Sequence, residues 1–519
     1  MPALRSAWPW LVGGAALAVA NAWLIYGDVN QFDESWTLQI VHRLAGGEAL
    51  YGDVHFTVTP LSIYLLSAVV GVVGQQILVV KALSALLAAA SALLVARICL
   101  QAGVSRFGAG VCALLTLPLA PAFPLSLYTP LAMLMFLVCE SLTLTASARR
   151  DLVWFAAAGG CAGLAFAAKQ NVGGLALLAL VAAAVVAEPM RDAIRRTLAA
   201  VATFSAVAGA TVLAMVASGG VRRTLDALGL AKGAYLDLGA VPYHDALASH
   251  VKTLARPGAW RDVVAGRDRD LLLASPRTIL PVVTALVLTT AWTAWWRRSR
   301  GSRSFDVPLA IVTVFAVAGF AAAFPRYEAV HLAWTAGPLL AACVAGLTRI
   351  LPSPGRAVRA VVVGLAGLWA VFALLGPLED WRSGERVHVG LPHFAAAWTS
   401  QQQRDRAATN VRRLGEELPD RRVFIVAGNA SFYYLSAGLE NPTRYDFPAT
   451  TTIGRREADE ILQGVGDGTV SAACLLEGPA NADDMRPLEL ERRLRQVLSP
   501  GPDVGLCRLW LRPRAGLDS

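Results

Sequence analysis

Long apolar runs, separated by short polar loops, fill most of the chain up to residue 376. Each run has roughly 17–25 residues, which is the length that an α-helix needs to cross the hydrocarbon core of a bilayer. We place membrane spans at residues 9–26, 76–98, 107–123, 127–147, 152–168, 172–188, 198–217, 277–296, 307–324, 332–349 and 358–376. The pattern therefore predicts a polytopic α-helical membrane protein with about eleven transmembrane helices.

One shorter apolar stretch tests this count. Residues 60–74 are apolar over about fifteen positions, which is short for a membrane span. A spanning helix here would move every later loop to the other side of the membrane. We interpret the stretch as a juxtamembrane or re-entrant helix on the outer face, with a spanning helix as the alternative.

The loops on one side of this arrangement carry clusters of arginine. With a cytoplasmic N-terminus, five arginine clusters fall on the inside. They are Arg97 with Arg106; Arg149 with Arg150; Arg191 with Arg195 and Arg196; Arg297 with Arg298, Arg300 and Arg303; and Arg349 with Arg356 and Arg359. Positive charge is enriched in cytoplasmic loops, so the pattern predicts a multi-pass protein of a bacterial-type cytoplasmic (inner) membrane. Because these arginines account for most of the net charge of +9, no binding to nucleic acid is expected.

After Gly376 the long apolar runs stop and shorter periodic patterns begin. Residues 422–426, 470–476 and 504–511 are typical of strands, whereas residues 455–462 and 488–498 have helical periodicity. We therefore predict a transmembrane domain over residues 1–376 and a small α/β domain over residues 377–519 on the outer, periplasmic face. Cys474 and Cys507 in this tail would form a disulfide in an oxidising compartment, or else stay free thiols.

Composition agrees with this division and excludes several function classes. The chain is 55% hydrophobic and 16% charged, with a mean hydropathy of +0.51, which is too apolar for a soluble protein. It contains no P-loop, no dinucleotide-binding glycine fingerprint, no HExxH and no GxSxG sequence. Nucleotide-driven transport and hydrolase triads therefore have no support in the sequence.

Two adjacent acids, Asp33 and Glu34, follow the first predicted span. They begin an amphipathic stretch whose apolar stripe includes Trp36 and Ile40, so they lie at the start of an interfacial helix on the outer face. One interpretation is an N-terminal cap, since acids favour the positive end of a helix. The other is a general base for an acceptor hydroxyl, with Asp33 as the base and Glu34 beside it.

A few cations lie where membrane topology does not require them. The chain has only four lysines, and Lys81 and Lys169 fall inside or at the end of apolar helices near the outer face. Charge at that depth usually meets a counter-charge or a ligand, and snorkelling is the alternative. Arg326 lies in an outer turn, where phosphate binding or pairing with Glu328 would explain it. His331, one helical turn further along, is a weaker candidate.

Asp53 and His55 lie in a loop with turn-forming glycines and could face the same cavity as Asp33. We include both as candidate substrate-binding residues. Two adjacent acids are too few ligands to predict a metal, so a divalent cation stays an open alternative.

Three stretches of the sequence resemble integral-membrane glycosyltransferases of the GT-C superfamily, in particular the branch of protein O-mannosyltransferases and aminoarabinose transferases. They are Phe32-Asp33-Glu34 with Leu44–Gly47 and Leu50–Asp53, then Thr59–Tyr64, and finally Gly163–Phe166 with Lys169-Gln170. The chain departs from the aminoarabinose branch before Pro60, where that branch has a lysine and this chain has Val58-Thr59. Lys81, Lys169 or Arg326 would then have to bind the phosphate.

The resemblance implies transfer of a sugar from a polyprenyl-phosphate-linked donor to a lipid, glycan or protein acceptor on the outer face. In such enzymes a carboxylate activates the acceptor and cationic side chains hold the departing lipid phosphate. The alternatives are a transporter of lipid-linked sugar or polysaccharide, and a non-catalytic relative. A transporter would need polar groups at mid-membrane depth, whereas the polar groups here gather on one face.

Overall fold

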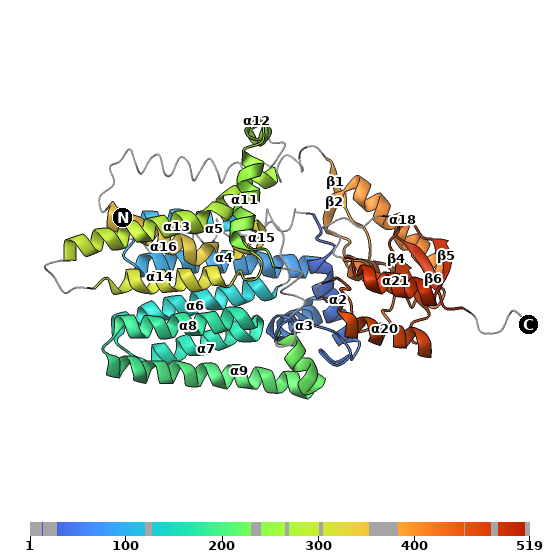
Figure 1. Ribbon diagram of the computed structural model, residues 1–519, viewed down its shortest axis with the longest axis horizontal. Helices are drawn as coiled ribbons and strands as arrows, with labels where there is room; N and C mark the ends of the chain where they lie inside the picture. Colours follow the sequence, from blue (N-terminus) through green and yellow to red (C-terminus); the bar gives the residue numbers. More distant parts are fainter. Residues whose placement is uncertain are drawn as a thin grey trace, which may run out of the picture.

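The computed structural model describes residues 28–119, 127–229, 240–264, 269–299, 305–351, 384–450, 452–478 and 486–513, together with residues 13 and 382. The predicted span at 358–376, and that at 9–26 apart from Gly13, lie outside the described residues. Long helices run side by side as a bundle, and the C-terminal domain lies against one end of it (Figure 1). We call this end of the bundle the domain end.

Each predicted span within the described residues corresponds to a helix. Among the described residues, five helices are long and apolar enough to cross a membrane: α4 (Ile77–Gln101), α6 (Tyr128–Arg149), α8 (Gln170–Ala187), α9 (Met190–Ala227) and α13 (Arg269–Ser299). Shorter apolar helices complete the bundle: α5 (Arg106–Leu119), α7 (Leu152–Ala168), α14 (Val307–Ala321) and α16 (Ala336–Ile350). The prediction of a multi-pass helical membrane protein is confirmed.

Small residues let the helices of the bundle approach closely. A Cβ atom added to Gly173 on α8 would lie 2.1 Å from the backbone nitrogen of Phe166 on α7. One added to Gly159 on α7 would lie 2.2 Å from the carbonyl oxygen of Ala200 on α9. Inside a membrane, where burial of apolar surface contributes little to helix association, such close backbone packing is a main source of stability.

Short helices occupy the ends of the bundle. α2 (Asp33–Ala45) and α3 (Leu61–Val73) lie next to each other at the domain end (Figure 1). Further along the chain come α11 (Tyr243–Leu254), α12 (Ala259–Val264) and α15 (Ala329–Trp334). α15 ends at Trp334 and α16 begins at Ala336, so the predicted span at 332–349 is interrupted near Thr335.

The C-terminal domain is α/β, as predicted. A four-stranded sheet has the order β3-β4-β6-β5, formed by β3 (Phe424–Val426), β4 (Ala472–Leu475), β6 (Arg508–Leu511) and β5 (Ser499–Asp503). β3 and β4 are parallel and the other pairs antiparallel, while β1 (Arg386–His388) and β2 (Trp398–Ser400) form a separate antiparallel pair. The helices of this domain are α18 (Gln401–Glu417), α19 (Ala430–Ala437), α20 (Arg455–Asp467) and α21 (Leu488–Val497).

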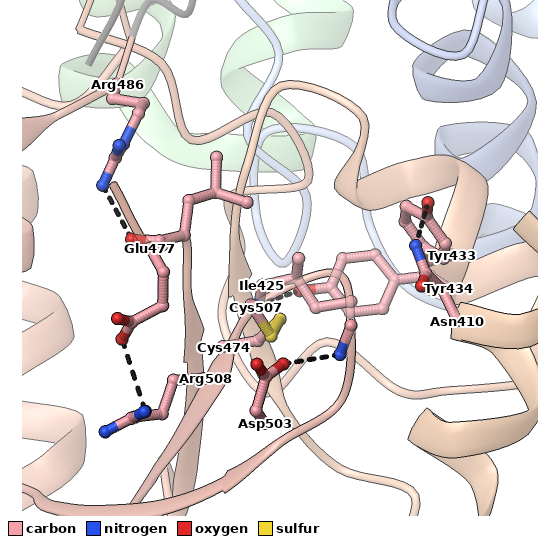
Figure 2. The surroundings of a disulfide bond; sticks show 12 residues. Asn410, Ile425, Tyr433, Tyr434, Cys474, Glu477, Arg486, Asp503, Cys507 and Arg508 are labelled. Atoms are coloured by element: carbon pink, nitrogen blue, oxygen red, sulfur yellow. Dashed lines mark hydrogen bonds and ion pairs between the residues drawn. A yellow bond between two sulfur atoms is a disulfide. The ribbon is translucent and has the colours of Figure 1, made fainter. Parts of the chain in front are cut away.

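A disulfide joins Cys474 on β4 to Cys507, just before β6, with 5.5 Å between the Cα atoms (Figure 2). Both cysteines are buried in the domain core. The bond therefore links the two neighbouring strands, and the free-thiol alternative is not what the structure shows.

The two domains share one apolar core at their junction. A single cluster of buried side chains runs from Trp36 and Leu38 on α2 to Phe432 and Tyr434 on α19. Backbone hydrogen bonds add to it, such as the one from the N–H of Ile77 to the carbonyl of His393 at 2.9 Å. The C-terminal domain thus packs directly on the helix that carries Asp33 and Glu34.

Candidate active site

Asn30 organises the start of α2. Its side-chain oxygen accepts hydrogen bonds from the backbone N–H groups of Phe32, at 2.9 Å, and Asp33, at 3.2 Å. The Asn30 side chain therefore holds the chain in a tight turn immediately before the helix. Phe32, the N-cap residue of this helix, makes no side-chain cap.

Glu34 belongs to a buried ion pair. Its carboxylate is fully buried and lies 3.2 Å from Nζ of Lys81 on α4, while its second oxygen accepts the backbone N–H of Asn30 at 3.0 Å. Lys81 also donates to the carbonyl of Asp28 at 3.2 Å. The apolar surroundings of a pair like this make either partner costly to leave alone. Lys81 is therefore engaged in the ion pair with Glu34.

Asp33 is in a different environment from its neighbour. Among the described residues its carboxylate has one hydrogen-bond partner, the side-chain amide of Asn30 at 3.4 Å. Burial raises the pKa of Asp33, and Asn30, His331 and Arg326 oppose that rise. A half-buried carboxylate without an ion-pair partner and with a raised pKa is a stronger base than an exposed aspartate.

Arg326 and His331 lie close enough to Asp33 to act on its charge. Arg326 donates from Nε to Glu328 at 2.8 Å, and Nδ1 of His331 lies 3.3 Å from the second oxygen of Glu328. Burial raises the pKa of Glu328, but the two cationic partners outweigh this and lower it. The expected alternative of pairing between Arg326 and Glu328 is therefore present, in a cluster whose positive charges lower the pKa of Asp33.

Neighbouring loops hold this turn in place. Backbone hydrogen bonds run from Val241 to the carbonyl of Pro325 and from Tyr327 to the carbonyl of Val241, each 3.0 Å. The side chain of Asn171, at the start of α8, donates to the carbonyl of Ala322 at 3.3 Å. These contacts tie the turn that carries Arg326 to the turn between α7 and α8.

Lys169 lies in that second turn, between α7 and α8. Its Nζ donates to the hydroxyl of Thr129 at 3.1 Å and lies 5.5 Å from the ring centre of Tyr128. Burial lowers the pKa of Lys169 to about 8. Within the part of the chain that the structure describes, no carboxylate pairs with this lysine.

Asp53 and His55 lie at the junction with the C-terminal domain. Asp53 accepts the backbone N–H of Ala49 at 2.8 Å and so closes its own turn. The His55 ring lies 5.1 Å from the ring of Tyr445, and the backbone N–H of His55 donates to the carbonyl of Arg444 at 2.7 Å. The structure brings Arg326 and His331 near Asp33, whereas His55 contacts the other domain and Asp53 bonds within its own turn.

The sequence did not single out the residues that hold α2 from its other end. Arg43 is buried in the last turn of α2 and donates to Asp446 at 3.0 Å and to Glu48 at 2.9 Å. Asp446 is fully buried and lies 403 positions away in the chain. Only the unusual position of an arginine on an amphipathic helix could have indicated this contact. Among the described residues, no group of three or more His, Cys, Asp or Glu side chains could hold a metal ion.

No known protein family matches the sequence, and no curated protein matches it. The structure, however, is similar to ArnT from Cupriavidus metallidurans, solved bound to undecaprenyl phosphate, with a TM-score of 0.58 over 98% of this chain and 99% of that chain, at 14% sequence identity. The chain shares the overall fold of ArnT, which is GT-C-like. This confirms at the level of fold the resemblance in the short sequence motifs. The arabinosyltransferase EmbB from Mycobacterium smegmatis is also similar, with a TM-score of 0.40 and 16% identity over 71% of this chain and 37% of that chain.

Proposed function

We propose that this GT-C protein is a membrane glycosyltransferase that moves a sugar from a polyprenyl-phosphate-linked donor to an acceptor, with Asp33 as the general base. The observation that carries the proposal is the contrast between two neighbouring acids. Glu34 is engaged in an ion pair with Lys81. Asp33 has no such partner among the described residues and lies near Arg326 and His331.

The proposed reaction uses these groups in one step. The oxygen of an acceptor hydroxyl bonds to the anomeric carbon of the sugar while the bond from that carbon to the lipid phosphate breaks. The electron pair of the broken bond leaves with the polyprenyl phosphate, and Asp33 takes the hydroxyl proton. Displacement of this kind inverts the configuration at the anomeric carbon.

The departing phosphate gains negative charge, which a nearby cation would stabilise. Lys169 is suited to this because no carboxylate among the described residues neutralises it. Arg326 already donates to Glu328, so it would bind the departing phosphate through its remaining N–H groups. The similarity of the fold to ArnT, which was solved bound to undecaprenyl phosphate, supports the proposed donor class.

We further propose that the reaction takes place on the outer face of a bacterial-type cytoplasmic membrane. Disulfides persist in oxidising compartments outside the cytosol, and the C-terminal domain contains the Cys474–Cys507 bond. α2, which begins at Asp33, lies at the domain end of the bundle (Figure 1). The acceptor is then a lipid, glycan or protein exposed on that face.

Asp33→Asn tests the base, with Glu34→Gln as the contrasting variant. We expect Asp33→Asn to fold normally and to lose about 10²–10⁴-fold in transfer rate, the range for removal of a general base. Glu34→Gln leaves Lys81 buried without its counter-charge, so its main effect is a lower melting temperature. The measurement is release of polyprenyl phosphate from labelled polyprenyl-phosphate sugars in membranes, by mass spectrometry, with melting curves of the purified variants.

Two outcomes contradict the proposal. The first is an Asp33→Asn variant that transfers sugar at the wild-type rate. The second is a wild-type protein that moves a labelled lipid-linked sugar across vesicle membranes without forming a glycosylated product, because that behaviour describes a transporter.

A further inference from the structure

A second polar site lies at the domain end, away from Asp33. It is a cleft of about 410 Å³ between the loop after α2, the end of α9 and α20 of the C-terminal domain. α9 is kinked at Gly220, whose φ is 78°, and the segment after the kink carries Arg223. The charged and aromatic side chains that line it are Arg43, Asp53, Arg223, Arg444, Tyr445, Glu460 and Asp467.

Two arginines of this cleft converge on the same backbone carbonyl. Arg223 donates from one terminal nitrogen to the carbonyls of Tyr51, at 3.3 Å, and Gly52. Arg444 donates to the carbonyl of Tyr51 at 3.1 Å from the other side of the domain junction. Two guanidinium groups from different domains therefore meet at a single oxygen.

Neither of these arginines has a carboxylate partner among the described residues. By contrast, Arg43 pairs with Asp446, and the buried Arg486 pairs with Glu491 at 2.8 Å. A guanidinium presents five N–H donors in a planar fork that fits a carboxylate or phosphate group. Arg223 and Arg444 use theirs only on carbonyls.

Arg444 also has a donor with nothing to bind. Its Nε is buried and has no hydrogen-bond partner among the residues that the structure describes. Burial lowers the pKa of Arg444, and the positive charges of Arg223 and Arg456 lower it further, against the opposing effect of Glu460. Like charges held together around an unused buried donor are unfavourable unless an anion joins them.

The acids of the cleft are engaged elsewhere. Asp53 accepts the N–H of Ala49, Glu460 accepts the hydroxyl of Tyr445 at 2.8 Å, and Asp467 accepts the N–H of Thr469 at 2.9 Å. Glu460 is near enough to favour the charge of Arg444, but it forms no ion pair with it. These three acids therefore do not occupy the N–H groups of Arg223 and Arg444, which can bind an anion.

We propose that this cleft binds a phosphoryl group, with Arg223 and Arg444 as its two ligands. The cleft is large enough for a headgroup and is formed partly by the end of a membrane helix, where lipid headgroups lie. The group is carried either by an anionic lipid or by a soluble phosphate compound, and both present the same tetrahedral oxygens to the two guanidinium forks. This inference does not rest on the transferase activity.

The test measures binding on the purified full-length chain. Inorganic phosphate is titrated against the melting temperature at constant ionic strength, and nanodiscs of phosphatidylcholine with and without phosphatidic acid form the second arm. We expect Arg223→Gln and Arg444→Gln to weaken the response at least about tenfold, the effect of losing a charge-assisted hydrogen bond. The matched control is Arg222→Gln, because Arg222 is the exposed neighbour of Arg223.

Misfolding of the two arginine variants could also weaken binding, so a third variant is expected to bind phosphate more tightly. Glu460→Gln keeps an acceptor for the Tyr445 hydroxyl but removes the negative charge near Arg444, so it should bind phosphate more tightly than the wild type. A response to both arms assigns the site to the phosphoryl group itself, and a response to phosphatidic acid alone assigns it to a lipid. The proposal is wrong if neither arm stabilises the wild type, or if Arg222→Gln weakens the response as much as Arg223→Gln.

Discussion

At the scale of single residues, the two acids that begin α2 show how position in space separates chemically similar groups. The sequence places Asp33 and Glu34 side by side at the start of a helix, where either could be the base. In the structure Glu34 points to Lys81 and is fully buried, while Asp33 lies near Arg326 and His331. Adjacent residues on a helix point about 100° apart, so they meet different neighbours.

The raised pKa of Asp33 predicts how activity depends on pH. A base must be deprotonated, so the transfer rate falls as the pH drops through the pKa of Asp33, at a higher pH than for an ordinary aspartate. Arg326 lowers that pKa, and Arg326→Gln should therefore move the acid limb of the kcat/KM profile to higher pH. Arg222→Gln, on an exposed side chain, should leave the limb unmoved. A limb that moves to lower pH in Arg326→Gln would contradict the assignment.

At the scale of elements, apolar periodicity predicted the helices well, but the packing between them depends on single small residues. Gly173 on α8 lies against the backbone of α7, whereas the next residue, Gly174, faces open space. Both glycines belong to the same apolar run of the sequence and have the same helix propensity. Only the neighbouring helix distinguishes them.

Substitution of these two glycines by alanine tests the close packing of α7 and α8. Gly173→Ala places a methyl group 2.1 Å from a backbone atom, so the helices must move apart and the melting temperature should fall by several degrees. Gly174→Ala should be neutral or slightly stabilising, because alanine favours the helix and meets no atom within 4 Å. Thermal unfolding of the two purified variants compares them directly, and equal melting temperatures would contradict the packing described here.

At the scale of the whole molecule, the C-terminal domain and the bundle form one functional unit. They share a continuous apolar core, and Arg43 of α2 is held by Asp446 of the C-terminal domain. The helix that carries Asp33 is thus positioned from both sides of the domain boundary predicted at residues 376–377.

The disulfide offers a test of membrane orientation. If the C-terminal domain lies outside the cytoplasm, Cys474 and Cys507 are oxidised in cells, and neither reacts with a maleimide reagent until a reductant is added. Gel mobility of the denatured protein, labelled with and without prior reduction, measures this. Labelling of both cysteines without reductant would place the domain in a reducing compartment. Their replacement by alanine should also lower the melting temperature, because the bond restricts the unfolded chain.

The sequence by itself determined the class of the protein, because membrane spans and a soluble α/β tail follow from the length and period of apolar runs. It also indicated Asp33, Glu34 and the cationic turns, since charge beside a membrane span is costly and needs a reason. The tertiary structure decided which of these groups come together. The pairing of Glu34 with Lys81, the approach of Arg326 to Asp33 and the meeting of Arg223 with Arg444 join residues far apart in the chain. Such contacts depend on how helices pack, and no local pattern of residues encodes them.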